Sequence, residues 1–191
     1  YQLNIGVMFM KKKYDIIVFI GRFQPLHNAH VEIIKKPSKM AEQVVIIIGS
    51  SFQPRTYKNP FTYWERYQMI NSSFQDVRIE SCEDIIYNDQ AWATKIQEIV
   101  GKHTKKIYGK IGIIGYEKDE SSYYLKMFPQ WELIKSELNE EVNATDLRSL
   151  FFTKNIKFLQ GLVPEGTFKF LENFRKGEHF PGLEKEYNFI Q

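Results

Sequence analysis

The stretch YDIIVFIGRFQPLHNAH, residues 14–30, decides the fold of this chain. Residues 14–20 form a short apolar run that ends at Gly21, which is typical of a strand buried on both faces of a sheet. After a loop, apolar residues recur with helical spacing from residue 31 to residue 41. This order predicts the first strand, loop and helix of an α/β fold, with the loop at the carboxyl edge of the sheet.

The same alternation of strand, loop and helix continues along the chain. We expect further strands at residues 44–48, 77–80, 111–114 and 131–135, and further helices at 62–72, 91–100, 146–152 and 167–174. Pro37 is expected to kink or split the first helix, and Ser38 can cap the second piece. The order predicts an α/β fold with a mostly parallel sheet of five or six strands and helices on both faces.

Length and composition exclude several classes of protein. A chain of 191 residues with 43% hydrophobic and 26% charged residues is one globular domain and neither disordered nor fibrous. The net charge of +3 suits an anionic small ligand and does not require a nucleic acid. The single cysteine excludes an internal disulfide framework and a zinc–cysteine cluster. No apolar run approaches the ~18 residues of a membrane span.

The two ends of the chain differ from the middle. The first ten residues are apolar and precede three lysines, which is the reverse of a secretory signal, so we expect a cytoplasmic protein. Residues 1–13 are interpreted as an N-terminal extension with Met10 as the natural start, and residues 14–175 as the domain. Residues 176–191 are polar and aromatic, and they are either a docked tail or the start of a missing segment.

The first loop, residues 21–30, carries the residues most suited to phosphate. Backbone N–H groups at a helix start attract an anion, Gly21 lets the backbone come close, and Arg22 adds a fixed charge. His27 and His30 are three residues apart, so both can face one side of the first helical turn. A metal site is the weaker alternative, since only two more histidines exist, both remote in sequence. A helix cap with a core contact is the purely structural alternative.

The second loop, PRTYKNPFTYWER at residues 54–66, holds three cations, Arg55, Lys58 and Arg66. Thr62 and Glu65 have the spacing of a capping box for the helix that follows. The alternative to ligand binding is a well-capped helix with solvated charges.

The third loop, NATDLR at residues 143–148, also opens a helix. Asn143 or Thr145 can cap this helix, and Arg148 one turn later can clamp a phosphate held by the helix start. A simple cap is the alternative.

A fourth stretch, DIIYNDQAW at residues 84–92, follows a predicted strand. Asn88 offers both a donor and an acceptor, as a carboxamide requires, and Trp92 can stack on a flat ring. Because Trp92 shares a helical face with Ile96, it can equally belong to the core.

Taken together, these motifs resemble a known family. GRFQPLHNAH resembles the (H/T)xGH signature of the nucleotidyltransferase superfamily, with a lead-in typical of archaeal-type nicotinamide mononucleotide (NMN) adenylyltransferases. NATDLR is similar to the ISxTxxR motif, and KNPFTYWER and the D-x-x-x-N-x-x-x-W pattern fit the same family. GYEKDESSYYLKMFPQW, residues 115–131, resembles a bacterial branch fused to a C-terminal Nudix hydrolase. The resemblance spans residues 14–191. It departs at Ala29, which replaces glycine, and at the third motif, which lacks the leading Ile-Ser.

The resemblance implies a Rossmann-like nucleotidyltransferase fold and synthesis of NAD and pyrophosphate from ATP and NMN. The 5′-phosphate of NMN has a second pKa of ~6 and is already ionised at pH 7, so it needs no general base. Catalysis would rest on positioning and charge neutralisation. The resemblance implies a catalytic role for His27, His30 and Arg148, a role in binding ATP phosphates for Gly21, Arg22, Phe23, Gln24, Lys58, Asn143 and Thr145, and a role in binding NMN for Asn88 and Trp92. It implies Mg²⁺ held mainly by substrate phosphates and water. The implied partners are nucleotides, a fused or separate Nudix hydrolase domain and further copies of the chain.

Two rival functions stay open at this point. A sister transferase would use nicotinate mononucleotide or another phosphate acceptor such as phosphopantetheine, and the first and third loops do not separate these. A non-catalytic sensor would bind NAD without making it, and Ala29 and the altered third motif favour that reading. A nucleic-acid binder has the least support, given the small net charge.

Overall fold

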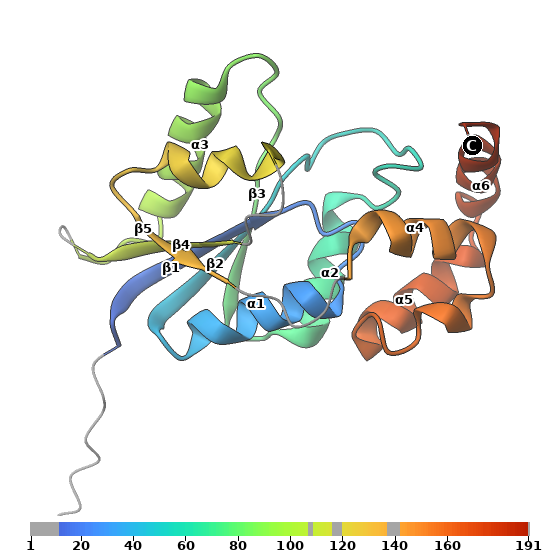
Figure 1. The fold of residues 1–191 in the computed structure, drawn as a ribbon, viewed down its shortest axis with the longest axis horizontal. Coiled ribbons are helices and arrows are strands. Elements are labelled where there is room, and N and C mark those ends of the chain that lie inside the picture. Colours follow the sequence, from blue (N-terminus) through green and yellow to red (C-terminus); the bar gives the residue numbers. More distant parts are fainter. Residues whose placement is uncertain (1–11, 107–108, 116–119, 137–141, 191) are drawn as a thin grey trace, which may run out of the picture.

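A computed structural model describes residues 12–106, 109–115, 120–136 and 142–190. Five strands form one sheet in the order β3-β2-β1-β4-β5, with every neighbouring pair parallel (Figure 1). The strands are β1 (Tyr14–Gly21), β2 (Ala41–Ile48), β3 (Val77–Ser81), β4 (Ile111–Gly115) and β5 (Glu132–Lys135). The α/β fold with a parallel sheet expected from the sequence is confirmed.

Helices cover both faces of this sheet. The α-helices are α1 (Asn28–Ser38), α2 (Tyr63–Ser73), α3 (Asp89–Gly101), α4 (Ala144–Thr153), α5 (Glu165–Arg175) and α6 (Phe180–Ile190). Two 3₁₀ helices, η1 (Glu120–Met127) and η2 (Ile156–Leu159), complete the described elements. In Figure 1, α3 and η1 lie on one face, α1 and α2 on the other, and α4, α5 and α6 gather beyond the carboxyl ends of the strands. None of the helices among the described residues is long and apolar enough to cross a membrane.

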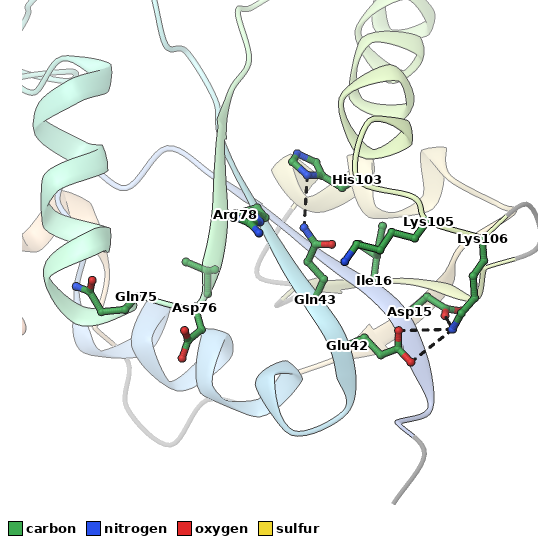
Figure 2. A pocket seen from close by; sticks show the side chains of 11 residues that line it. Asp15, Ile16, Glu42, Gln43, Gln75, Asp76, Arg78, His103, Lys105 and Lys106 are labelled. Carbon is green, nitrogen blue, oxygen red and sulfur yellow. Dashed lines mark hydrogen bonds and ion pairs between the residues drawn. The ribbon is translucent and has the colours of Figure 1, made fainter. Parts of the chain in front are cut away.

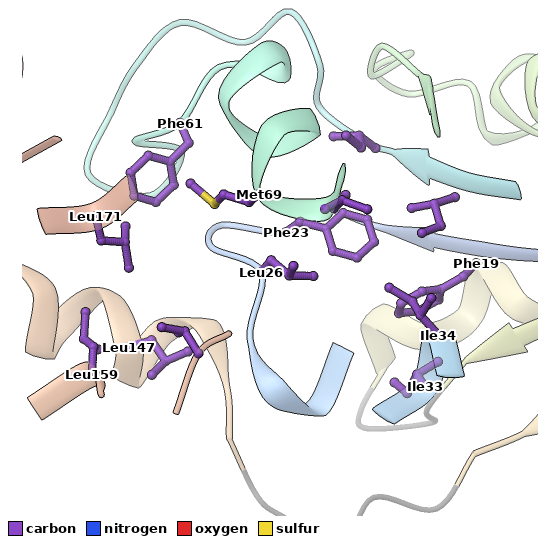
Figure 3. Close-up of a cluster of buried hydrophobic side chains, with 14 of the residues drawn as sticks. Phe19, Phe23, Leu26, Ile33, Ile34, Phe61, Met69, Leu147, Leu159 and Leu171 are labelled. Atoms are coloured by element: carbon purple, nitrogen blue, oxygen red, sulfur yellow. The ribbon is translucent and has the colours of Figure 1, made fainter. Parts of the chain in front are cut away.

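Alternate side chains of β1 pack into two separate hydrophobic cores. Ile17 and Phe19 belong to the larger core, shared with α1, α2 and α4–α6, and part of this core is drawn in Figure 3. Ile16, Val18 and Ile20 belong to the smaller core beneath α3 and η1. Because successive side chains of a strand point to opposite faces, and both faces are covered, the strand needs apolar residues almost without a break. This explains the apolar run in the sequence.

The end of α1 differs from the expectation. Pro37 lies in the last turn of α1 and the helix stops at Ser38, so the predicted second helical piece to residue 41 is wrong. Ser38 Oγ donates to the Ile34 carbonyl (3.2 Å) and does not cap a new helix. Ala41 instead starts β2, paired with Tyr14. A proline this close to a helix end costs little, and pairing with β1 then favours the extended chain.

The remaining expected elements are present, with ends shifted by one to three residues. The expected strand at 131–135 begins at Glu132, and Trp131 packs its ring on Phe128 instead, at 4.4 Å between ring centres. Both 3₁₀ helices and α6 were missed by the sequence reading. The proposed N-terminal extension with its start at Met10 lies almost entirely outside the described residues. The proposed boundary after residue 175 falls at the end of α5 and stays a prediction.

The C-terminal segment forms a packed helix. Phe180, Leu183 and Tyr187 of α6 are buried in the larger core. The rings of Phe152 and Tyr187 stack at 5.2 Å, which holds α6 against α4.

Candidate functional site

Three of the predicted loops meet at the carboxyl edge of the sheet, and Gln24 joins them. Its side chain pairs with the main chain of Phe61, donating to the carbonyl (2.8 Å) and accepting from the N–H (3.0 Å). Its own carbonyl accepts a hydrogen bond from Arg148 Nη1 (3.0 Å). Gln24 is only 2% exposed, and it holds the first loop against the second through its side chain and against the third through its main-chain carbonyl.

His27 and His30 stand at the start of α1 as a stacked pair. Their ring centres are 3.7 Å apart, and the N–H of His27 donates to Nδ1 of His30 (3.4 Å). Burial, followed by the charge of His27, holds the pKa of His30 well below its ordinary value. His30 is therefore a neutral imidazole near pH 7. Since its Nδ1 accepts, we assign its proton to Nε2, where it can be donated to a ligand.

The ring of Phe23 packs against this histidine pair. Its ring is 1% exposed and lies 4.8 Å from the ring of His30. Its backbone has a φ of +52°, in the left-handed region that most residues avoid. A Cβ added at Gly21 would come within 3.0 Å of the Phe23 ring, so glycine allows the turn to close tightly. The Phe23 side chain thus shapes the loop, and only the neighbouring Arg22 is exposed.

Arg66 fixes the shape of two of these loops and is buried while doing so, at 1% exposed. Its guanidinium donates to the carbonyls of Arg22 (2.8 Å), Gly49 (2.7 Å), Ser50 (3.1 Å) and Thr62 (3.1 Å). Burial, and then the charge of Arg22, lowers the pKa of Arg66 to about 10. The sequence left open whether Arg66 binds a ligand or serves the structure, and these four bonds show the structural role.

Arg148 occupies a different environment. It is 8% exposed, and it donates to the Gln24 carbonyl (3.0 Å) and to Thr145 Oγ1 (3.2 Å). Burial, and then the charge of Arg22, lowers its pKa. Among the described residues, no carboxylate forms an ion pair with either arginine. Arginine is a residue type that binds phosphate and carboxylate groups, so this pair is a candidate site for an anion.

Asn143 caps α4 beside this arginine. Its Oδ1 accepts from the N–H of Asp146 (3.0 Å), and its amide donates to the Asp146 carboxylate (2.6 Å). Thr145 is exposed at the first turn of α4. The start of α4 therefore presents one hydroxyl and one arginine toward the same edge as the histidines.

The cations of the second loop lie in different environments. Arg55 forms a two-pronged ion pair with Glu65 (2.6 and 2.8 Å) and donates to the Pro60 carbonyl, so it holds the loop. The expected capping box between Thr62 and Glu65 is confirmed. Lys58 is exposed at the turn, with its Nζ 5.7 Å from the centre of the Tyr57 ring.

Asn88 and Trp92 lie together at the start of α3, after the carboxyl end of β3. Asn88 caps the helix by accepting from the N–H of Ala91 (2.9 Å) and is otherwise exposed. Trp92 is half-buried, edge-on to Tyr124 with ring centres 6.1 Å apart. Tyr124 in turn donates to the carbonyl of Ile20 (3.2 Å), just before the first loop. The sequence analysis assigned no role to Tyr124, which lies on the unpredicted 3₁₀ helix η1.

A hollow of about 280 Å³ lies at the opposite, amino edge of the sheet (Figure 2). Within its lining, Lys106 pairs with Asp15 and Glu42, and His103 bonds Glu80 (2.7 Å). Ligands of such sheets bind at the carboxyl edge, so we place the functional site there. Among the described residues, no three His, Cys, Asp or Glu side chains gather closely enough to hold a metal ion.

Comparison with known proteins identifies the family of the chain. The sequence model of the cytidylyltransferase-like family matches residues 18–150, from β1 into α4, and so includes all the loops described above. The chain belongs to this family.

Two curated relatives are similar over nearly their whole length. Nicotinamide/nicotinic acid mononucleotide adenylyltransferase of Acinetobacter baylyi is 38% identical over 92% of this chain and 94% of its own. Nicotinamide-nucleotide adenylyltransferase of Methanococcus maripaludis is 33% identical over 88% of this chain and 96% of its own.

A solved structure is also similar. It is a bifunctional NMN adenylyltransferase/ADP ribose pyrophosphatase from Francisella tularensis, complexed with AMP and a manganese ion. It is 34% identical with a TM-score of 0.79, and the match covers 93% of this chain and 54% of that one. This chain thus spans about half the length of the bifunctional protein.

Proposed function

We propose that this chain transfers the adenylyl group of ATP to nicotinamide mononucleotide, forming NAD and releasing pyrophosphate. One observation carries the proposal: the stacked histidines at the start of α1 and the buried Arg148 of α4 are joined through Gln24 at one edge of the sheet. The relatives with this activity in their names align with the chain across all of these elements.

The reaction is a displacement at the α-phosphorus of ATP. An oxygen of the NMN 5′-phosphate forms a bond to this phosphorus, and the bond to the bridging oxygen breaks, so pyrophosphate leaves with the electron pair. With a second pKa of ~6, the attacking phosphate is ionised at pH 7 and no side chain has to remove a proton. The barrier comes from repulsion between anions and from alignment, which fixed cations and donors lower.

We assign the phosphates to the first and third loops. The neutral His30 donates its Nε2 proton to a phosphate oxygen, and His27 beside it serves the same phosphates at the helix start. Arg148 stabilises the charge that develops at the α-phosphate and on the leaving group. The main chain at Gly21–Gln24, with Arg22, Asn143 and Thr145, completes this pocket, and Lys58 reaches the phosphates from the second loop.

A divalent cation accompanies ATP in this proposal. With no acidic cluster among the described residues to hold it, Mg²⁺ would be held by phosphate oxygens and water. Bound in this way, it would neutralise phosphate charge, and the protein would position the complex through the donors named above.

We assign the nicotinamide to the start of α3. Asn88 is exposed and can pair with the carboxamide, and the half-buried Trp92 offers a ring for stacking. An uncharged Asn88 favours the amide over the acid, while the relative from Acinetobacter baylyi carries both acceptors in its name. We further propose that the chain works in the cytoplasm, where both nucleotides are available.

The test measures pyrophosphate release from ATP and Mg²⁺, with nicotinamide and nicotinate mononucleotide in parallel. We expect turnover with the amide, with NAD identified as the product by chromatography. Faster turnover with nicotinate mononucleotide would keep the chemistry and overturn the assignment of Asn88. No turnover with either acceptor, together with tight binding of NAD, would replace the enzyme by a non-catalytic NAD sensor.

A further inference from the structure

The turn that carries Lys58 is held by a residue far along the chain. A carboxylate oxygen of Glu186, Oε2, accepts a hydrogen bond from the backbone N–H of Tyr57 (3.0 Å), 129 positions away in sequence. The next residue of α6, Tyr187, packs its ring edge-on to Tyr57 with ring centres 5.9 Å apart. Two consecutive residues of the C-terminal helix therefore fix the residue that precedes Lys58.

The turn itself is closed by its own main chain. Thr56 and Asn59 exchange N–H to carbonyl hydrogen bonds of 3.3 and 3.0 Å, which leaves Tyr57 and Lys58 as the two central residues. Closing the turn sets its local shape and leaves its position in the protein to outside contacts. At Tyr57 these contacts are the carboxylate of Glu186 and the ring of Tyr187.

The same helix is fixed to the element that carries Arg148. The hydroxyl of Tyr187 donates to Ser149 Oγ (3.0 Å), and Ser149 is the residue after Arg148. Phe180 and Leu183 anchor α6 in the larger core. The helix thus links the turn with Lys58 to the middle of α4, next to Arg148.

We propose that Glu186 is a positioning residue that places Lys58 over the phosphate site, which makes α6 a part of that site. The inference rests on the proposed adenylyl transfer in one respect, namely that Lys58 binds ATP phosphates. Glu186 touches no substrate in this proposal and acts only through the backbone of Tyr57.

A double-mutant cycle on the full chain tests the link. The variants are Glu186→Ala, Lys58→Ala and the pair combined, with KM for ATP and kcat measured by pyrophosphate release. Loss of one hydrogen bond that orients a charged group corresponds to about a threefold to tenfold rise in KM for ATP. In the Lys58→Ala background we expect Glu186→Ala to add nothing, since there is no lysine left to position. An equal factor in both backgrounds, or no effect of Glu186→Ala alone, would overturn the proposal.

Two further variants separate this role from general damage to the helix. Glu186→Gln keeps an oxygen that accepts the Tyr57 N–H, so it should retain wild-type KM. Glu184→Ala makes the same change of charge on the same helix and should behave like wild type. A Glu186→Gln variant as impaired as Glu186→Ala would show that charge, and not the hydrogen bond to Tyr57, is what matters.

A readout without substrate distinguishes failure of this inference from failure of the proposed function. Trypsin cleavage after Lys58, followed by mass spectrometry without nucleotide, should be faster in Glu186→Ala than in wild type, Glu186→Gln or Glu184→Ala. If the wild-type chain turned over neither acceptor but Glu186→Ala was still cleaved faster, the proposed function would be wrong. The role of Glu186 in holding the turn would nevertheless be supported. Equal cleavage rates in all four proteins would show that Glu186 does not hold the turn, whatever the activity of the chain.

Discussion

Replacing Arg66 with methionine tests whether one buried arginine holds the carboxyl edge of the sheet together. Methionine keeps the apolar stem of the side chain and removes the charge and all the donors. The carbonyl of Thr62 keeps a partner, because it also accepts from the backbone N–H of Arg66 (3.1 Å). The carbonyls of Arg22, Gly49 and Ser50 lose the guanidinium donor.

The size of the effect follows from these three carbonyls. A buried acceptor left without its donor costs about 1–3 kcal/mol. Since the loops lie at the edge of the sheet, water can reach part of this space, and we take about 1 kcal/mol for each, or ~3 kcal/mol in all. For a chain of this length, 1 kcal/mol corresponds to roughly 2–4 °C in Tm, so the Tm should fall by about 10 °C.

Thermal unfolding followed by circular dichroism measures this fall. Arg78→Met is the matched control, because Arg78 is exposed on β3 and should change stability by less than about 0.5 kcal/mol. Arg66→Lys keeps the charge with fewer well-placed donors, so its Tm should lie between wild type and Arg66→Met. A Tm for Arg66→Met within about 2 °C of wild type would refute the reasoning, because the three carbonyls would then be satisfied without the arginine.

Three further predictions concern activity, packing and pH. Arg148→Ala should lower kcat for pyrophosphate release by roughly 10²–10³, as for loss of a donor that stabilises developing charge; an unchanged kcat with a raised KM would contradict that role. Ala29→Gly should leave kcat unchanged and cost about 0.5–1 kcal/mol in urea unfolding, because the Ala29 methyl is buried and glycine weakens a helix; a higher kcat would show that the methyl crowds the phosphates. Because the folded pKa of His30 lies below its ordinary 6.5, the unfolded chain binds a proton there first, and stability is lost as pH falls below about 6.5. Between pH 7.5 and pH 5.5, the free energy of unfolding should fall less in His30→Asn than in wild type. Equal falls in the two proteins would argue against a desolvated, neutral imidazole at His30.

The order of elements and the place of the site could be read from the sequence. Strand β1 needs apolar residues on both faces, and this requirement appears directly as a run of apolar letters. The caps of α2 and α4 follow from residues three positions apart, which are neighbours in any helix. Because ligands of parallel sheets bind where the strands end, the sequence also placed the first loop, residues 21–30, at the carboxyl edge.

Only the tertiary structure separated residues of the same type. Arg66 and Arg148 each lie in the first turns of a helix, so their local patterns are alike. Arg66 donates to carbonyls of other segments. Arg148 faces the candidate site and forms no ion pair with a carboxylate among the described residues. Likewise, the side chain of Gln24 bonds the main chain of Phe61, 37 positions along the chain, and that of Glu186 bonds the main chain of Tyr57, 129 positions back. Local periodicity contains no information about which distant segments will meet, because that is decided when the helices pack on the sheet.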